Sequence, residues 1–343
     1  MLSIRGNGMF NFEKLCSLNA VSGNEHNVSD YLSDILSEIY ENVNVDSYGN
    51  VVVLDDRGSN CTVMLDAHID QIGLVVKEID EQGFIRFINS GGMDTSILPT
   101  SEVMVHGKED LFGVIGAKPP HLKTKDEDSS LKLEDMYIDC GLSAEEIKNI
   151  VSLGDTISLK AEFACLKNNY YTSKSLDNRV SVYIVGECLK RLKDKKLKYN
   201  LVGSFSVQEE LGCRGASLVA ERIKPDIAIV IDVTFGVSPY TSEEDGFSTG
   251  KGVTVAVGPN VDRKLTEKFI QNCKDNNFAF EKEVCGGSTG TNAWPIQIAG
   301  VGTKCLVVSV PIKYMHTSVE MVNKSDMETA IDSICSALEG GIL

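Results

Sequence analysis

The chain has 343 residues, of which 42% are hydrophobic, so it is long enough for one large globular domain with a smaller one beside it. Its formal net charge of −16 disfavours nucleic-acid phosphates and anionic membrane surfaces as partners. No apolar run reaches the roughly 18 residues of a membrane span. The 10 cysteines stand at scattered spacings without a Cys-x-x-Cys pair, which indicates reduced thiols and a cytoplasmic location.

Helix and strand patterns alternate in the first part of the chain. Amphipathic helices are predicted at 10–17 and 25–40, and buried strands at 51–54 and 63–67. His68 and Asp70 directly follow the second of these strands. Since α/β enzymes place catalytic groups at strand ends that open onto turns, this pair is a candidate for a functional site.

From about residue 73 the pattern changes to short alternating stretches separated by turn residues, which is typical of a small all-β unit. These stretches lie at 74–79, 83–88, 103–106, 113–117 and 156–159. The polar segment 123–130 is predicted to be a mobile surface loop, or a segment ordered only by substrate or a neighbouring subunit. We therefore predict an α/β domain, 1–71 and 171–343, interrupted by a β domain at 72–170.

The helix and strand alternation returns after residue 171. Predicted elements lie at 179–192, 201–207, 217–223, 227–233, 265–276, 305–310 and 325–338. Adjacent Glu209 and Glu210 follow the strand at 201–207 and precede two glycines that suit a tight turn into a helix. One carboxylate of such a pair can bind a metal while its neighbour carries a proton, although a solvated charged pair is the ordinary alternative.

Three further polar residues occupy similar positions. Asp177 precedes a predicted helix, Asp232 ends the apolar run at 227–231, and His316 follows the strand at 305–310. Each has an ordinary explanation as a helix cap, a strand end or a loop residue. Together with the earlier candidates they form a set of nitrogen and oxygen ligands without thiolates, which suits catalytic zinc, cobalt or manganese.

The order of these motifs resembles the dinuclear metallo-aminopeptidases that assemble as tetrahedral particles, a family of glutamyl and deblocking aminopeptidases with some members labelled cellulase. The resemblance covers nearly the whole chain. It is carried by the segments 67–73, 176–179, 207–210, 231–234 and 314–320. It implies a metallo-aminopeptidase sandwich with a central mixed sheet flanked by helices, and a small PDZ-like or barrel-like β domain that mediates dimerisation.

The resemblance also implies two divalent ions per subunit, zinc or cobalt before manganese, and a role for each candidate residue. The implied ligands are His68 and Asp232 on one ion, Glu210 and His316 on the other, and Asp177 as the bridge. Glu209 would be the general base. Asp70 would orient His68, as ligating histidines usually require.

Three residues depart from the family pattern. Gln71 stands where glutamate is usual, so we expect altered polarity near the metals rather than loss of metal. Lys313 replaces a common arginine. Asn292, in a segment that resembles a loop lining the substrate cleft, replaces a frequent aspartate, which would change the field felt by a substrate. These departures bear on specificity more than on the reaction.

The predicted function is metal-dependent hydrolysis of N-terminal residues from short peptides. Hydrolysis of another amide, such as an N-acyl amino acid, is the first alternative. A glycosidase is disfavoured because the candidate acids are committed to metal. A thiol nucleophile is disfavoured because no cysteine has a histidine-bearing motif nearby, and intact candidate ligands argue against a non-catalytic assembly protein.

Apolar runs in the predicted β domain, such as 113–116, indicate a homo-oligomer, because such runs are usually covered by a symmetric partner surface. The family resemblance implies dimers that assemble into a tetrahedral dodecamer with the active sites facing inward.

Overall fold

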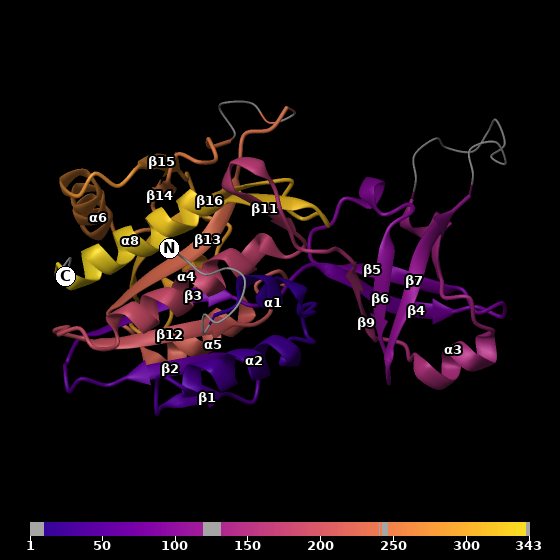
Figure 1. Ribbon diagram of the computed structural model, residues 1–343. Helices are drawn as coiled ribbons and strands as arrows, with labels where there is room; N and C mark the ends of the chain where they lie inside the picture. Colours follow the sequence, from indigo (N-terminus) through magenta and orange to yellow (C-terminus); the bar gives the residue numbers. More distant parts are fainter. Residues whose placement is uncertain (1–9, 119–131, 240, 242–245, 341–343) are drawn as a thin grey trace.

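A computed structural model of the protein describes residues 10–118, 132–239, 241 and 246–340, so the predicted loop at 123–130 lies outside the described residues. Figure 1 shows a large α/β part on the left and a small β barrel on the right. No helix in the described ranges is long and apolar enough to cross a membrane. The predicted fold class, a helix-flanked mixed sheet with a small β domain, is confirmed.

The large part is built on one mixed sheet with the strand order β1-β2-β12-β3-β13-β16-β17-β11-β10, to which β14 and β15 are added beside β16. Its strands are β1 Val43–Val45, β2 Val51–Asp55, β3 Thr62–His68, β10 Ala164–Cys165, β11 Tyr170–Ser173, β12 Asn200–Ser206, β13 Ile227–Phe235, β14 Val253–Val257, β15 Phe280–Val284, β16 Lys304–Lys313 and β17 Glu320–Asn323. The central strands β12, β3, β13 and β16 run parallel, so their carboxyl ends lie along one edge of the sheet.

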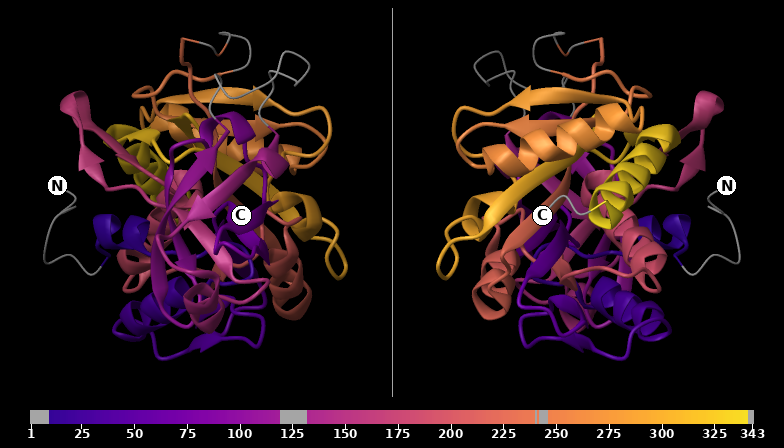
Figure 2. Two further views of the ribbon diagram at one scale, coloured as in Figure 1. Left: turned by 90° about the vertical axis from the view of Figure 1, so that its right-hand side faces the viewer. Right: turned by 90° about the vertical axis from the view of Figure 1, so that its left-hand side faces the viewer.

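Helices cover both faces of this sheet. They are α1 Phe12–Ser17, α2 His26–Ser37, α4 Leu176–Leu192, α5 Arg214–Ile223, α6 Arg263–Asp275, α7 Ala293–Ile296 and α8 Lys324–Glu339. Figure 2 shows α6 and α8, which contact each other, on one face. Along β3, Val63 and Leu65 pack in the core with α1, α2, α4, α6 and α8, whereas Met64 packs in the opposite core with α5 and α7. This alternation follows from the two-residue period of a strand.

Local sequence explains several of these elements. Val28, Leu32 and Leu36 recur at four-residue spacing and form the buried stripe of α2. The side chain of Asp262 accepts from the backbone N–H of Leu265 and caps the start of α6. Every residue of β13 before Phe235 is buried, as expected for a strand covered on both faces.

The small part is a closed antiparallel barrel with the order β4-β5-β8-β7-β6-β9 and a separate apolar core. Its strands are β4 Gly73–Ile79, β5 Ile85–Ser90, β6 Glu102–His106, β7 Asp110–Ala117, β8 Met136–Asp139 and β9 Thr156–Leu159, and helix α3, Ala144–Ile150, lies between the last two. The barrel strands end at Leu159, and β10 pairs with β11 in the large sheet. The division of the chain at 72–170 stays a prediction.

Candidate metal centre

All six predicted ligand and base residues line one cleft of about 320 Å³ at the carboxyl edge of the parallel strands. They are His68, Asp177, Glu209, Glu210, Asp232 and His316. His68 is the last residue of β3 and pairs in register with Ser206 of β12, so the Glu209-Glu210 turn begins beside it. Parallel strands thus bring together residues that are far apart in the sequence.

The two oxygens of Asp177 face different partners. Oδ1 lies 3.1 Å from His68 Nε2, and Oδ2 lies 3.2 Å from His316 Nε2. Asp232 Oδ1 is 3.8 Å from His68 Nε2, and Glu210 Oε1 is 3.4 Å from His316 Nε2. The five residues therefore form two groups that share Asp177, with the ligand atoms of each group within 4.8 Å of one another. This donor set and this spacing suit two divalent ions that share one carboxylate.

A second acidic residue, Glu320, holds two of these groups by their backbones. Its Oε2 accepts from the N–H of Asp177 at 3.0 Å, and its Oε1 accepts from the N–H of His316 at 2.8 Å. Burial, followed by the negative charge of Asp177, raises the pKa of Glu320. Glu320 is part of the segment 314–320, but nothing in that sequence indicated that it links the start of α4 to the loop after β16.

Asp232 is also fixed from α4. Asn178 Nδ2 donates to Asp232 Oδ1 at 2.9 Å and to the carbonyl of Ile231 at 3.2 Å. The peptide bond between Asp177 and Asn178 is cis, and both residues have non-helical backbone angles inside α4. Asp177 contacts both histidines, and the next residue, Asn178, contacts Asp232, so the start of α4 touches both ligand groups.

Asp70 lies beneath the cluster and contacts three elements. Its Oδ1 accepts from the backbone N–H of Glu209 at 2.9 Å, and its Oδ2 accepts from the N–H of Glu210 at 3.1 Å and from Ser22 Oγ at 2.6 Å. His68 Nδ1 is 3.2 Å from Asp70 Oδ1, but the two atoms are not in hydrogen-bond geometry. Asp70 is therefore close enough to orient His68, and it also fixes the turn that carries both glutamates.

Glu209 lies beside both groups and has its own thiol partner. Its carboxylate is close enough to His68 and Glu210 to form a third set of ligand atoms within 4.8 Å. Cys213 Sγ donates to Glu209 Oε1 at 3.3 Å. Burial raises the pKa of Glu209, and the negative charges of Glu210 and Asp177 reinforce the shift against the opposing effect of His68. A raised carboxyl pKa favours a group that must both accept and return a proton.

The three departures from the family pattern lie away from the cleft lining. Gln71 is buried and accepts from Lys174 Nζ at 3.1 Å. Lys313 lies over the ring of Tyr170. Asn292 is buried, donates to Asp66 Oδ2 at 2.8 Å and does not itself line the cleft, so its effect on the field felt by a substrate stays a prediction. The neighbouring Thr289, Gly290 and Thr291 do line the cleft, because the segment turns inward after them.

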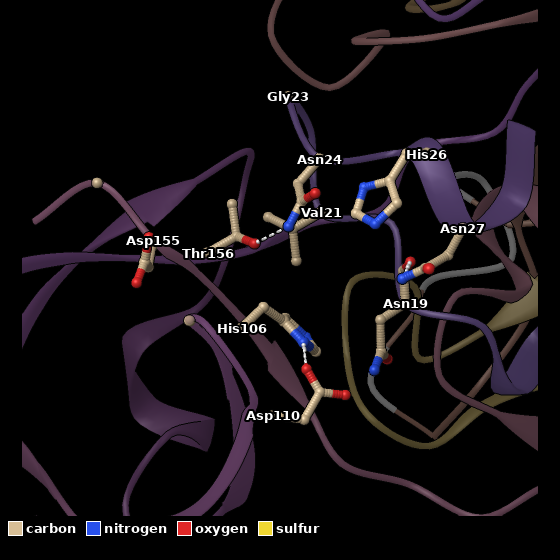
Figure 3. Close-up of a pocket in the computed structure, with 12 residues that line it drawn as sticks. Asn19, Val21, Gly23, Asn24, His26, Asn27, His106, Asp110, Asp155 and Thr156 are labelled. Carbon is tan, nitrogen blue, oxygen red and sulfur yellow. Dashed lines mark hydrogen bonds and ion pairs between the residues drawn. The ribbon is translucent and has the colours of Figure 1, made fainter. Parts of the chain in front are cut away.

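A second cavity, of about 520 Å³, lies between the segment 19–27 and the barrel (Figure 3). His106 lines this cavity and contacts an aspartate and a serine in a Ser-His-Asp arrangement. Its Nδ1 lies 2.7 Å from Asp110 Oδ1, and its Nε2 lies 2.9 Å from Ser158 Oγ. A hydrolytic triad needs a nucleophile that a substrate can reach. Ser158 is only 1% exposed and does not line the cavity, so this chain of contacts stabilises the barrel rather than forming an active site.

The comparisons with known proteins show the family of the chain. Residues 49–332 match the M42 glutamyl aminopeptidase family. A lysyl aminopeptidase of Pyrococcus furiosus is 32% identical over 335 residues, which are 95% of each chain. A TET aminopeptidase from the marine sediment archaeon Thaumarchaeota archaeon SCGC AB-539-E09 superposes with a TM-score of 0.91 at 27% identity, over 95% of this chain and 94% of that one. The TET1 peptidase of Pyrococcus horikoshii gives a TM-score of 0.85 at 30% identity, over 96% and 99%.

The chain belongs to the M42 glutamyl aminopeptidase family. It is a metal-dependent aminopeptidase, so the predicted family and reaction class are confirmed.

Proposed function

We propose that the protein removes N-terminal residues from short peptides with two divalent ions, zinc or cobalt before manganese. The observation that supports this most strongly is the split contact of Asp177, whose Oδ1 and Oδ2 lie 3.1 Å and 3.2 Å from two different histidines. His68 and Asp232 would hold one ion, Glu210 and His316 the other, and Asp177 would bridge them. When bound, such a pair lowers the pKa of water and polarises the scissile carbonyl.

The protein's own groups would then move the proton. Glu209 is the general base in this proposal, because it borders both ligand groups yet leaves each with three other residues. It would accept the proton of the attacking water and return it to the leaving amine. Asp70 would hold Glu209 beside His68 by accepting the hydrogen bond from the backbone N–H of Glu209 at 2.9 Å. Glu320 would do the same for Asp177 and His316.

We further propose a homo-oligomer that associates through the barrel. Ile88, Phe112 and Val114 are each more than 40% exposed on β5 and β7. Apolar side chains exposed in this way are usually covered by a symmetric copy. The Pyrococcus horikoshii relative assembles into a tetrahedron or a large octahedral shell, which supports a dimer-based shell here. We also propose a cytoplasmic location, because all ten cysteines are free and disulfides are rare in the cytosol.

Peptides with free and with N-acetylated termini test this function. The metal-loaded protein should release the first residue of a short free peptide and leave its acetylated counterpart intact, which mass spectrometry would record. Release of acetyl groups, or cleavage at internal bonds of a folded protein, would show a deacylase or an endopeptidase instead.

A further inference from the structure

The cleft contains one carboxylate that the proposed reaction does not use. Among the described residues that line it, five are acidic. Asp177, Glu210 and Asp232 are assigned to metal and Glu209 to proton transfer. The fifth is Glu283 on β15, a strand that belongs to neither the parallel centre of the sheet nor the recognised motifs.

Two buried hydroxyls fix the Glu283 carboxylate in place. Thr234 Oγ1 donates to Oε1 at 2.9 Å, and Thr254 Oγ1 donates to Oε2 at 2.8 Å. The two threonines are 5% and 1% exposed. Each carboxylate oxygen can accept more than one hydrogen bond, so capacity remains on the cleft side. Among the residues that the structure describes, no lysine, arginine or histidine forms an ion pair with Glu283.

The distance of Glu283 from the proposed metal cluster determines which part of a substrate Glu283 can contact. Thr234 lies two residues beyond Asp232 on β13 and therefore on the same face of the strand, roughly 7 Å further along. A substrate's α-amino group is attached one carbon from the scissile carbonyl, so it has to lie at the metal cluster itself. Glu283 lies farther from the metal cluster than the α-amino group would, in the region into which the side chain of the N-terminal residue would extend.

The surrounding surface suits a long side chain with an apolar stem. Phe235, which is 60% exposed, and Met315 both line the cleft. Lysine and arginine place their methylene stems along apolar surface and their charges against an acceptor. An acidic side chain at the same position would meet the negative charge of Glu283 and be rejected.

We propose that Glu283 selects substrates whose N-terminal residue carries a cationic side chain, lysine or arginine. This inference rests on the proposed aminopeptidase function and adds the substrate class to it. Among the described residues no cationic side chain pairs with Glu283, so a substrate cation that reaches it can form that ion pair.

Turnover of lysyl, norleucyl and glutamyl anilides by the metal-loaded protein tests the selection. The lysyl substrate should have the highest kcat/KM, and Glu283→Gln should lower it by about 10-fold, the lower end for a hydrogen bond to a charged group. The kcat/KM of the norleucyl substrate should not change, because norleucine lacks the side-chain ammonium of lysine. Glu281→Gln is the matched control, since Glu281 lies on the same strand but is exposed and does not line the cleft. Equal kcat/KM for lysyl and norleucyl substrates would overturn the inference and leave the aminopeptidase function standing.

Calorimetric binding of free L-lysine and L-norleucine gives a second readout that needs neither turnover nor a variant. The wild-type protein should bind lysine about 10-fold more tightly. If it binds lysine preferentially but hydrolyses no peptide, the recognition by Glu283 holds and the proposed function fails. If both amino acids bind alike, the inference is wrong whatever the activity.

Discussion

The Asp70 carboxylate accepts a hydrogen bond from the backbone N–H of Glu209, with 2.9 Å between Oδ1 and N. The same carboxylate lies 3.2 Å from His68 Nδ1 and accepts from the N–H of Glu210. One buried side chain therefore sets the distance between the end of β3 and the turn after β12.

Asp70→Asn should lower metal affinity and turnover by roughly 10- to 100-fold, the usual range for a group that supports ligands. The amide keeps the size of the side chain but can accept at one oxygen only. Ser22→Ala is the control, because it removes a contact to Asp70 without touching the turn, and its effect should be smaller. Metal titrations that give the wild-type affinity for a folded Asp70→Asn protein would contradict this role.

Glu209→Gln should keep both ions and lower kcat by about 100-fold or more, the scale of a positioned general base. Because Glu209 also lies within ligand distance of His68 and Glu210, elemental analysis has to accompany the kinetics. Loss of one ion would make Glu209 a ligand, and near-normal turnover at full occupancy would remove it from the mechanism.

Asp177→Ala should weaken both metal sites, because its two oxygens face two different histidines. His68→Ala should weaken mainly the site that it shares with Asp232. Metal content after dialysis measures the difference. Equal loss from the two variants would be evidence against a bridging carboxylate.

The buried Lys174 gives a prediction about stability. Burial lowers the pKa of this ammonium to about 7, and the charge of Arg179 contributes. Its Nζ donates to the neutral Gln71. Between pH 7 and its ordinary pKa the unfolded chain binds this proton and the folded chain does not, so stability rises with pH in that window. As pH falls from the ordinary pKa towards 7 this stability is lost, and below 7 the group contributes no further change.

Urea unfolding at pH 7 and pH 9 would measure this contribution. The wild-type protein should gain up to about 2 kcal/mol relative to Lys174→Met between these two values. Gln71→Glu should reduce the gain, because a carboxylate beside the ammonium restores its pKa. An identical pH dependence in wild type and Lys174→Met would show that Lys174 does not titrate in this window.

The sequence predicted the residues that end apolar strands and failed where the structure depends on tertiary contacts. His68 and Asp232 were recognisable because each follows or ends a continuous buried run, and parallel strands necessarily place such ends at one edge of the sheet. Glu283 was not recognisable. Its strand carries three consecutive charged residues at an edge of the sheet, and its threonine partners come from two other strands.

Burial also explains why only part of one expected segment reaches the cleft. The segment around Asn292 was expected to line the cleft because it resembles a family loop. Thr289, Gly290 and Thr291 do line it, whereas Asn292 is buried and hydrogen-bonds to Asp66. Helix α3 and strand β15 were not predicted, because α3 buries only Ile147 and β15 carries three consecutive charged residues, so neither shows an apolar period. Glu320 contacts Asp177 only after the chain has folded, because 143 positions separate the two residues.

The most direct test of the two-ion aminopeptidase is a titration of zinc or cobalt into metal-free protein, with release of the first residue of a tripeptide followed by mass spectrometry. We predict no release without metal, and activity that rises until about two ions are bound per chain. Full activity of the metal-free protein, or activity that stays absent at full metal occupancy, would contradict the account.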